Sequence, residues 1–145
     1  MSNKPDLSIV ILNYNTRQLT LDCLASLIKV KSEVDFEIIL CDNGSTDGSV
    51  EAIRSKYPSV IIVENNANMG FAKGNNVGIR YALRQGASHI LIINPDVTVG
   101  KKFFRPLLAE LTKSPQAGLV APAIKHRQKG VIFFGLEGKV DWNTG

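Results

Sequence analysis

Short runs of apolar residues alternate along the chain with segments that have helical periodicity. Four of these runs predict buried strands, at residues 7–12, 36–41, 60–63 and 89–94. Because they are apolar at nearly every position rather than at alternate ones, we expect both faces of each strand to be covered. Strand and helix in alternation predict a mostly parallel sheet with helices on each side, a Rossmann-like three-layer α/β/α fold.

Helical spacing fills the intervals between these strands. A helix is expected from about Thr16, which is a suitable N-cap, and its buried face would carry Leu24, Leu27 and Ile28. A second helix would carry Val50, Ile53 and Tyr57 on one face and end at Pro58.

The second half of the chain continues the alternation. A loop rich in glycine and asparagine is expected over residues 64–76, followed by a helix that ends near Gly86. Phe103, Leu107, Leu108 and Leu111 indicate another helix, with Pro106 in its first turn. Residues 118–124 predict a fifth strand, and residues 130–142 predict a short hairpin.

Composition adds few constraints. The 145 residues suit one α/β domain, and a hydrophobic content of 44% is sufficient for a core. Cys23 and Cys41 lie inside apolar segments and form no CxxC pair, so we expect buried, reduced thiols and a cytoplasmic protein. The first ten residues lack the apolar region of a secretory signal, and no run approaches the ~20 apolar residues of a membrane span.

The net charge of +4 suits a phosphorylated ligand. One basic cluster, Lys125, His126, Arg127 and Lys129, could bind acidic lipid or nucleic acid, but so short a group favours a solvated loop, and no nucleic-acid partner is expected.

Polar residues follow each of the first four strands. The sequences at these points are "NYNT", "DNGSTD", "ENN" and "NPD". In parallel sheets the ligand lies beyond the carboxyl ends of the strands, near a point where the strand order reverses. One aromatic ring with carboxylates and amides could stack on a base, accept hydrogen bonds from base or ribose, and hold a cation.

Each of these residues also has a structural interpretation. Asp42-Asn43-Gly44 and Asn94-Pro95-Asp96 are good turn sequences, Tyr14 could pack on a loop, and Asp47 is best explained as a helix cap. Their coincidence at one edge, which turn chemistry does not require, favours a binding site. The chain has no GxGxxG, GxxxxGK[ST], GxSxG or HExxH motif, which argues against dinucleotide oxidoreductases, P-loop enzymes, α/β-hydrolases and zincins.

Four segments together resemble the inverting family-2 glycosyltransferases of GT-A fold, and most of all their rhamnosyltransferase-like branch. They are "LSIVILNYNTRQLTLDCLASL", "EIILCDNGSTDGSVEAI", "NNANMGFAKGNNVGIRYAL" and "HILIINPDVTV", in the order of the family. The resemblance covers residues 6 to 125 and implies a nucleotide-sugar transferase with a divalent metal, Mn²⁺ or Mg²⁺.

The resemblance also implies roles for particular residues, which would together bind the nucleotide-sugar. Asn13 and Tyr14 would contact the base, and Asp42 would accept from base or ribose. The loop with Gly70 would lie against the nucleotide or its diphosphate through Lys73, Asn75 and Asn76, although Lys73 could equally be a solvent-facing helix lysine. Asn94-Pro95-Asp96 falls where the family has Asp-x-Asp, so Asp96 would be the metal ligand. With Asn94 in place of the first acid, we expect weaker metal binding without nucleotide.

In the family, the general base is an acid downstream of the metal motif. Glu110, Glu137 and Asp141 match no such motif, so the base is expected outside this chain. We therefore expect residues 1–125 to be the donor-binding domain and residues 126–145 the start of an incomplete acceptor-binding half, with the chain cut short at its C-terminus and inactive by itself.

The resemblance further implies a UDP- or dTDP-sugar donor, a saccharide or lipid-linked saccharide acceptor, and a part in bacterial surface polysaccharide synthesis. The full-length enzyme would lie in the cytoplasm and associate peripherally with the inner face of the membrane. A non-catalytic nucleotide-binding module is the alternative. A nucleotidyltransferase is disfavoured because no glycine-rich loop follows the first strand.

Overall fold

The computed structural model describes residues 7–128 and 131–135. They fall into two compact units, Met1–Phe103 and Phe104–Gly145. The first unit contains β1 (Leu7–Asn13), α1 (Arg17–Lys29), η1 (Lys31–Glu33), β2 (Phe36–Asp42), α2 (Ser49–Lys56), β3 (Ile61–Glu64), α3 (Phe71–Gln85) and β4 (His89–Ile93). The second contains α4 (Phe104–Lys113), β5 (Ile124–Gln128) and β6 (Val131–Gly135).

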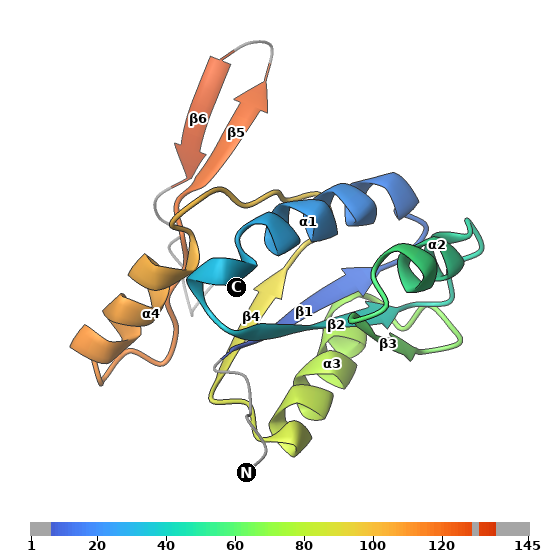
Figure 1. Ribbon diagram of the computed structural model, residues 1–145, viewed down its shortest axis with the longest axis horizontal. Helices are drawn as coiled ribbons and strands as arrows, with labels where there is room; N and C mark the ends of the chain where they lie inside the picture. Colours follow the sequence, from blue (N-terminus) through green and yellow to red (C-terminus); the bar gives the residue numbers. More distant parts are fainter. Residues whose placement is uncertain (1–6, 129–130, 136–145) are drawn as a thin grey trace, which may run out of the picture. The chain divides into compact units, whose positions relative to one another are not determined.

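The first unit is a parallel four-stranded sheet in the order β3-β2-β1-β4. The helices α1 and α2 pack together on one face, and α3 lies on the other (Figure 1). This is the expected α/β/α layering. It follows from right-handed crossovers, because the chain moves outward from β1 to β3 and then returns through α3 to the opposite side of β1. The strand order therefore reverses between β1 and β4.

The core follows from the apolar runs. The side chains of Ile9, Val10 and Ile11 in β1 and of Ile39 and Leu40 in β2 are fully buried. Along β1, Val10 and Leu12 lie against the glycines of α3, so Ile9, Ile11 and Asn13 face the layer of α1 and α2. Asn13 thus places a polar side chain at the end of an otherwise apolar column.

Two glycines of α3 determine how closely this helix packs on the sheet. The side of the helix that meets the sheet carries Gly74 and Gly78, one turn apart. A Cβ atom on Gly78 would lie 2.6 Å from Cys41 Sγ and from Val10 Cγ1, and one on Gly74 would lie 2.5 Å from Leu12 Cδ1. Only glycine allows this approach, so the helix backbone rests directly on β1 and β2.

Several expectations for the first unit are confirmed. The four strands and the first two helices lie close to where the pattern put them, and α3 ends as expected at Gly86, in a left-handed conformation, although it begins at Phe71 inside the segment expected to be a loop. Cys23 and Cys41 are free and fully buried. However, Ile28 is 37% exposed rather than part of the buried face of α1.

The second unit corrects the predictions for the end of the chain. Residues 118–123 form no strand. The strand β5 begins at Ile124 and, within the part of the chain that the structure describes, pairs with β6 alone, in antiparallel register. Pro122 interrupts the apolar run, and proline cannot donate to a sheet ladder. The two strands of the hairpin are thus Ile124–Gln128 and Val131–Gly135, whereas the hairpin was expected over residues 130–142, of which 130 and 136–142 lie outside the described part. Pro106 occupies the first turn of α4, as expected.

The expected functional boundary at residue 125 stays a prediction, because the compact units divide at Phe103 on backbone contacts alone. None of the described helices is both long and apolar enough to cross a membrane.

Candidate functional site

The carboxyl ends of the strands bring the predicted site residues to one edge of the sheet. Asn13 pairs with Asp42 across β1 and β2, and Ile11 pairs with Ile93 across β1 and β4, so Asn94 to Asp96 emerge beside Asn13. Adjacent strands are about 4.8 Å apart, which places the ends of β2 and β4 about 10 Å from each other. We call Asn13, Tyr14, Asp42, Asn94 and Asp96 the polar edge.

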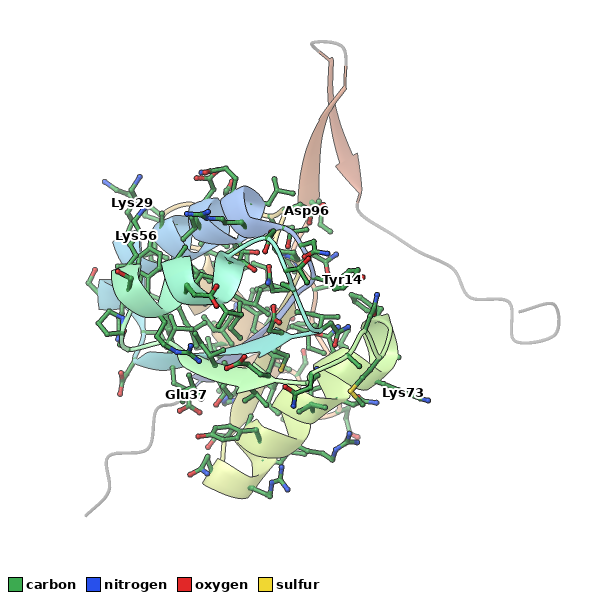
Figure 2. The ribbon with its side chains drawn as sticks, turned by 90° about the vertical axis from the view of Figure 1, so that its right-hand side faces the viewer. Tyr14, Lys29, Glu37, Lys56, Lys73 and Asp96 are labelled. Carbon is green, nitrogen blue, oxygen red and sulfur yellow. The ribbon has the colours of Figure 1, made fainter. Side chains whose placement is uncertain are left out.

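Figure 2 shows the same arrangement with side chains. Tyr14, Lys73 and Asp96 all lie on the side of the first unit where the strands end, whereas Glu37, Lys29 and Lys56 lie on the opposite side. The polar edge and the beginning of α3 therefore lie at the same end of the sheet, the carboxyl end of its strands. This end includes the reversal of strand order where ligands of open α/β sheets bind.

Asn13 is the hub of this edge rather than an exposed contact. Its side chain has no exposed surface. The Nδ2 group donates to Asp42 Oδ1 at 2.6 Å, to Ser45 Oγ at 2.9 Å and to Ser49 Oγ at 2.8 Å. Its Oδ1 accepts from the hydroxyl groups of Thr16 and Thr20 in the layer of α1. With both ends of the amide engaged and buried, Asn13 positions its neighbours, in contrast to the expected contact with a base.

Asp42 is held almost as tightly. It is 2% exposed, and its carboxylate accepts four hydrogen bonds. Oδ1 accepts from Asn13 and from the Ser45 hydroxyl, and Oδ2 accepts from the backbone N–H groups of Gly44 and Ser45. A carboxylate has about four lone-pair sites, so these donors fix its orientation at the base of the edge.

The loops after β1 and β2 are clamped to each other. The Asn15 side chain accepts from Thr46 N at 2.8 Å, and Asn15 N donates to the Ser45 hydroxyl at 3.0 Å. Tyr14 lies between Asn13 and Asn15, which are both held by hydrogen bonds, and the residue is 45% exposed. An aromatic ring on a fixed backbone that still faces solvent is suited to stack on a planar ligand.

Asp47 caps helices, as expected, but at two places. Asp47 lies one residue before Gly48, the N-cap residue of α2, and its carboxylate accepts from Ser49 N at 3.1 Å at the start of α2 and from Arg17 N at 2.9 Å at the start of α1. Desolvation opposes ionisation, but the hydrogen bonds from Ser49 and Arg17 outweigh it and hold the pKa of Asp47 below its usual value. Thr16 is the N-cap residue of α1 but makes no side-chain cap bond, and its hydroxyl donates to Asn13 Oδ1.

The residues expected in a loop after Gly70 belong to a helix. Lys73, Asn75 and Asn76 lie in the first turns of α3, which begins at Phe71. Lys73 and Asn76 are exposed, whereas Asn75 is 4% exposed, donates to the Phe71 carbonyl and has an Oδ1 atom without a hydrogen-bond partner among the described residues. The uncapped N–H groups of a helix beginning, with a lysine beside them, favour an anion.

A buried asparagine that the sequence indicated only as part of a turn, Asn43, connects the start of α3 to the polar edge. Asn43 is 1% exposed. Its Nδ2 donates to Asn68 Oδ1 and to the Gly70 carbonyl, and its Oδ1 accepts from Asn65 Nδ2. Asn43 N also donates to the Asn13 carbonyl at 2.9 Å. The turn sequence Asp42-Asn43-Gly44 hid this function, because Asn before Gly is common in any turn.

Asn94 to Val97 form a turn in which Val97 N donates to the Asn94 carbonyl at 3.2 Å. The Asn94 and Asp96 side chains are exposed, and no hydrogen bond or ion pair to the Asp96 carboxylate occurs among the described residues. Burial raises the pKa of the Cys23 thiol beneath this turn to about 12, and the negative charge of Asp96 adds to the rise. Asp96 is therefore an available carboxylate close to α1.

Among residues 7–124, no group of three or more His, Cys, Asp and Glu side chains could hold a metal ion. Asp96 offers one charged oxygen ligand and Asn94 one neutral carbonyl oxygen. Such a donor set fits a divalent cation that takes its remaining ligands from phosphate oxygens and water, as Mg²⁺ and Mn²⁺ commonly do. The residues thus fit a cation that arrives with a diphosphate.

Sequence comparison agrees with this geometry. The family described as glycosyl transferase family 2 matches residues 8–139. The chain belongs to glycosyl transferase family 2. Among curated members of the family, an N-acetylglucosaminyl-diphospho-decaprenol L-rhamnosyltransferase of Mycobacterium tuberculosis is 31% identical over 110 residues, which cover 70% of this chain and 36% of that protein. A dTDP-rhamnosyl transferase of Shigella flexneri is 27% identical over 120 residues, covering 83% and 39%.

Solved structures show the same fold. S. aureus TarS 1–349 in complex with UDP has a TM-score of 0.65 at 22% identity, covering 76% of this chain and 33% of that one. A mannosyltransferase from Pyrobaculum calidifontis, in complex with GDP-Man and Mn²⁺, has a TM-score of 0.60 at 21% identity, covering 86% and 37%. The fold is thus the GT-A fold, and this family-2 chain spans little more than a third of the length of these relatives.

Proposed function

We propose that this family-2 chain binds the nucleoside diphosphate part of a sugar donor across the polar edge and the beginning of α3. The observation that carries the proposal is the exposed Tyr14 ring and the unpaired Asp96 carboxylate, which flank the reversal of strand order on backbones that are both fixed by hydrogen bonds. The UDP and GDP-Man complexes of proteins with this fold support it.

In this proposal the base stacks on Tyr14. Asp42, whose carboxylate already accepts four hydrogen bonds, holds the loop beneath the nucleoside and offers at most a shared lone pair to it. The N–H groups at the start of α3 and the Lys73 ammonium face the diphosphate.

Asp96, with help from Asn94, would hold a divalent cation between the protein and the two phosphate groups. When bound, Mn²⁺ or Mg²⁺ supplies charge that stabilises the departing diphosphate. The protein itself keeps the diphosphate on one side of the anomeric carbon, so that an acceptor hydroxyl attacks from the other side and the sugar is transferred with inversion.

A general base must take the proton of that hydroxyl. None of the carboxylates at the polar edge is free for this step, since Asp42 is buried and Asp96 serves the cation. We propose that the base belongs to the longer protein, together with the acceptor site. The names of the two relatives favour a dTDP-sugar donor and a lipid-linked saccharide acceptor. The UDP complex of a protein with this fold favours a UDP-sugar as the other donor. We propose in addition that the longer protein takes part in surface polysaccharide synthesis in the cytoplasm, at the inner face of the membrane.

Calorimetric titration of this chain with UDP, dTDP and GDP, each in Mn²⁺ and in EDTA, tests the donor site. We expect one nucleotide to bind and Mn²⁺ to strengthen its binding. Asp96→Asn should remove the Mn²⁺-dependent part, whereas Asp35→Asn, an exposed aspartate just before β2 at the opposite edge, should change nothing. Absence of binding by all three nucleotides would contradict the proposal.

The alternative is a nucleotide-binding module without turnover, which the neutral Asn94 in place of an acid favours. Both functions predict the same titrations. They differ in the full-length protein, where only the enzyme releases nucleotide from a sugar donor when acceptor is present.

A further inference from the structure

The segment that follows β4, residues 94–102, is attached to one side of α1 and η1. Three polar contacts attach it, in order along the chain: Cys23 Sγ with the Asn94 carbonyl at 3.8 Å, Ser26 Oγ with Val99 N at 3.0 Å, and Glu33 Oε1 with Lys102 N at 2.5 Å. The segment therefore follows α1 from its middle to the 3₁₀ turn beyond its end.

The position of Asp96 depends on how its backbone is attached, rather than on contacts of its side chain. Its side chain is exposed, and no hydrogen bond or ion pair to its carboxylate occurs in the described part of the chain. The strand β4 has ended three residues earlier, at Ile93, and the Asn94–Val97 turn is closed by one bond of 3.2 Å. The position of the carboxylate is thus set by how the backbone on both sides of the turn is held.

Ser26 makes the best-defined of these attachments. Its hydroxyl donates to the Cys23 carbonyl at 2.7 Å, and its oxygen accepts from Val99 N at 3.0 Å. A hydroxyl has one hydrogen, and Ser26 donates it to the Cys23 carbonyl of its own helix. A lone pair of the hydroxyl oxygen is therefore left to point toward residues 94–102. The Cys23 contact at the other end is longer and has a weak thiol donor.

The same helix also reaches the base side of the site. Thr20, on α1 six residues before Ser26, donates to Asn13 Oδ1 at 2.8 Å, and Asn13 holds Asp42. One rigid helix therefore sets both Asp42 and the turn that carries Asp96, and so the distance between the two halves of the polar edge.

We propose that Ser26 is a positioning residue for the cation–diphosphate half of the donor site. Its hydroxyl holds the segment after β4 so that Asp96 meets a cation on the diphosphate. This inference rests on the proposed function, and it adds a residue of α1 that would touch neither nucleotide nor metal but would set the metal-dependent part of the affinity.

The test compares nucleotide binding in Mn²⁺ and in EDTA for Ser26→Ala, with Mn²⁺ binding followed separately by electron paramagnetic resonance. We expect the affinity in Mn²⁺ to fall about fivefold, the equivalent of one ordinary hydrogen bond, and the affinity in EDTA to stay unchanged. Hydrogen exchange of the Val99 amide, measured without any ligand, should become faster. Ser26→Thr keeps the hydroxyl and should restore all three values.

Thr112→Ala is the matched control. The Thr112 hydroxyl also donates back to a carbonyl of its own helix, that of Leu108 at 3.0 Å, but it accepts from no backbone N–H of another segment among residues 7–128 and 131–135. Its loss should change neither the Mn²⁺-dependent affinity nor Val99 exchange. Val99→Pro removes the same hydrogen bond from its other partner, because proline has no backbone N–H. It should lower the Mn²⁺-dependent affinity as Ser26→Ala does, and it tests the inference independently if Ser26→Ala fails to fold.

Equal losses in Mn²⁺ and EDTA would overturn the inference, because they would indicate a general loss of structure. Unchanged binding in both conditions, or unchanged Val99 exchange, would overturn it as well. These outcomes are distinct from failure of the proposed function, in which the unaltered chain binds no nucleotide.

Discussion

Replacement of Asn13 by aspartate tests the hub with almost no change of shape. In the native protein Asn13 Nδ2 donates to Asp42 Oδ1 at 2.6 Å. Asn13→Asp puts a second carboxyl oxygen at that position, where both partners are 2% exposed or less. Two carboxylates in contact cannot both be ionised, so the variant must take up a proton to fold.

The cost of that proton depends on pH. A carboxyl group in the unfolded chain loses its proton near pH 4, and each pH unit above this adds about 1.4 kcal/mol to the cost of keeping the proton on. At pH 7 the variant should therefore be about 4 kcal/mol less stable than the native protein. Folding of the variant favours the protonated form, so the variant is most stable at low pH and loses stability as the pH rises. The difference in unfolding free energy between the native protein and the variant should therefore shrink by about 1.4 kcal/mol per pH unit as the pH is lowered from 7 to 5.

Urea unfolding followed by circular dichroism at pH 5, 6, 7 and 8 measures this gap. Asn13→Ala is the control, since it removes the same donor without adding a charge and should show a gap that varies little with pH. The double variant Asn13→Asp, Asp42→Asn exchanges donor and acceptor and should recover much of the stability. A gap for Asn13→Asp that is independent of pH would refute the assignment of Asn13 as the buried donor to Asp42.

Two further predictions concern the elements around this hub. Gly78→Ala should lower the free energy of unfolding by about 1–3 kcal/mol in the same urea assay, because its Cβ would lie 2.6 Å from Cys41 Sγ and α3 must move away from the sheet. Gly118→Ala is the control, since a Cβ at Gly118 has open space. Equal stability of the two variants would contradict the close packing of α3 on the sheet. Asp47→Ala should cost about 1 kcal/mol at neutral pH, the usual value of a helix cap. Because the folded pKa of Asp47 is below the ordinary value of 3.8, its contribution is present above that value and is lost as the pH falls through the lower folded one, so thermal melts of the two proteins should converge only in acid and not at pH 5.

The sheet of the first unit could be predicted because its strands are continuously apolar and its crossovers have one hand. The beginning of α3 could not. Gly70, Gly74 and the asparagines on either side of them, Asn68, Asn75 and Asn76, are typical of a loop. Gly74 and Gly78, however, are glycines because β1 and β2 leave no room for a Cβ. Local composition does not distinguish a residue that permits a turn from one that permits close packing.

The candidate site shows a similar limit. The sequence indicated which polar residues end the strands, and the strand register does bring them to one edge. It could not indicate which of them face inward. Asn13 lies on the face of β1 that meets α1, where the hydroxyl groups of Thr16 and Thr20 donate to its side-chain oxygen. The residue expected to contact a base is therefore buried. Asn43 and Ser26 escaped notice because their partners are distant in sequence.

The contact of α3 with the sheet has a consequence for how the protein would choose its ligand. With glycine backbone seated on Val10 and Leu12, the start of the helix cannot slide toward or away from Tyr14 and Asp42 without separating the layers. Residues held on such fixed elements need little ordering when a ligand arrives, so most of the contact energy is retained as affinity. Selectivity between nucleobases would then follow from the outline of a few fixed side chains, and exchanging one of them should redirect preference without remodelling the backbone.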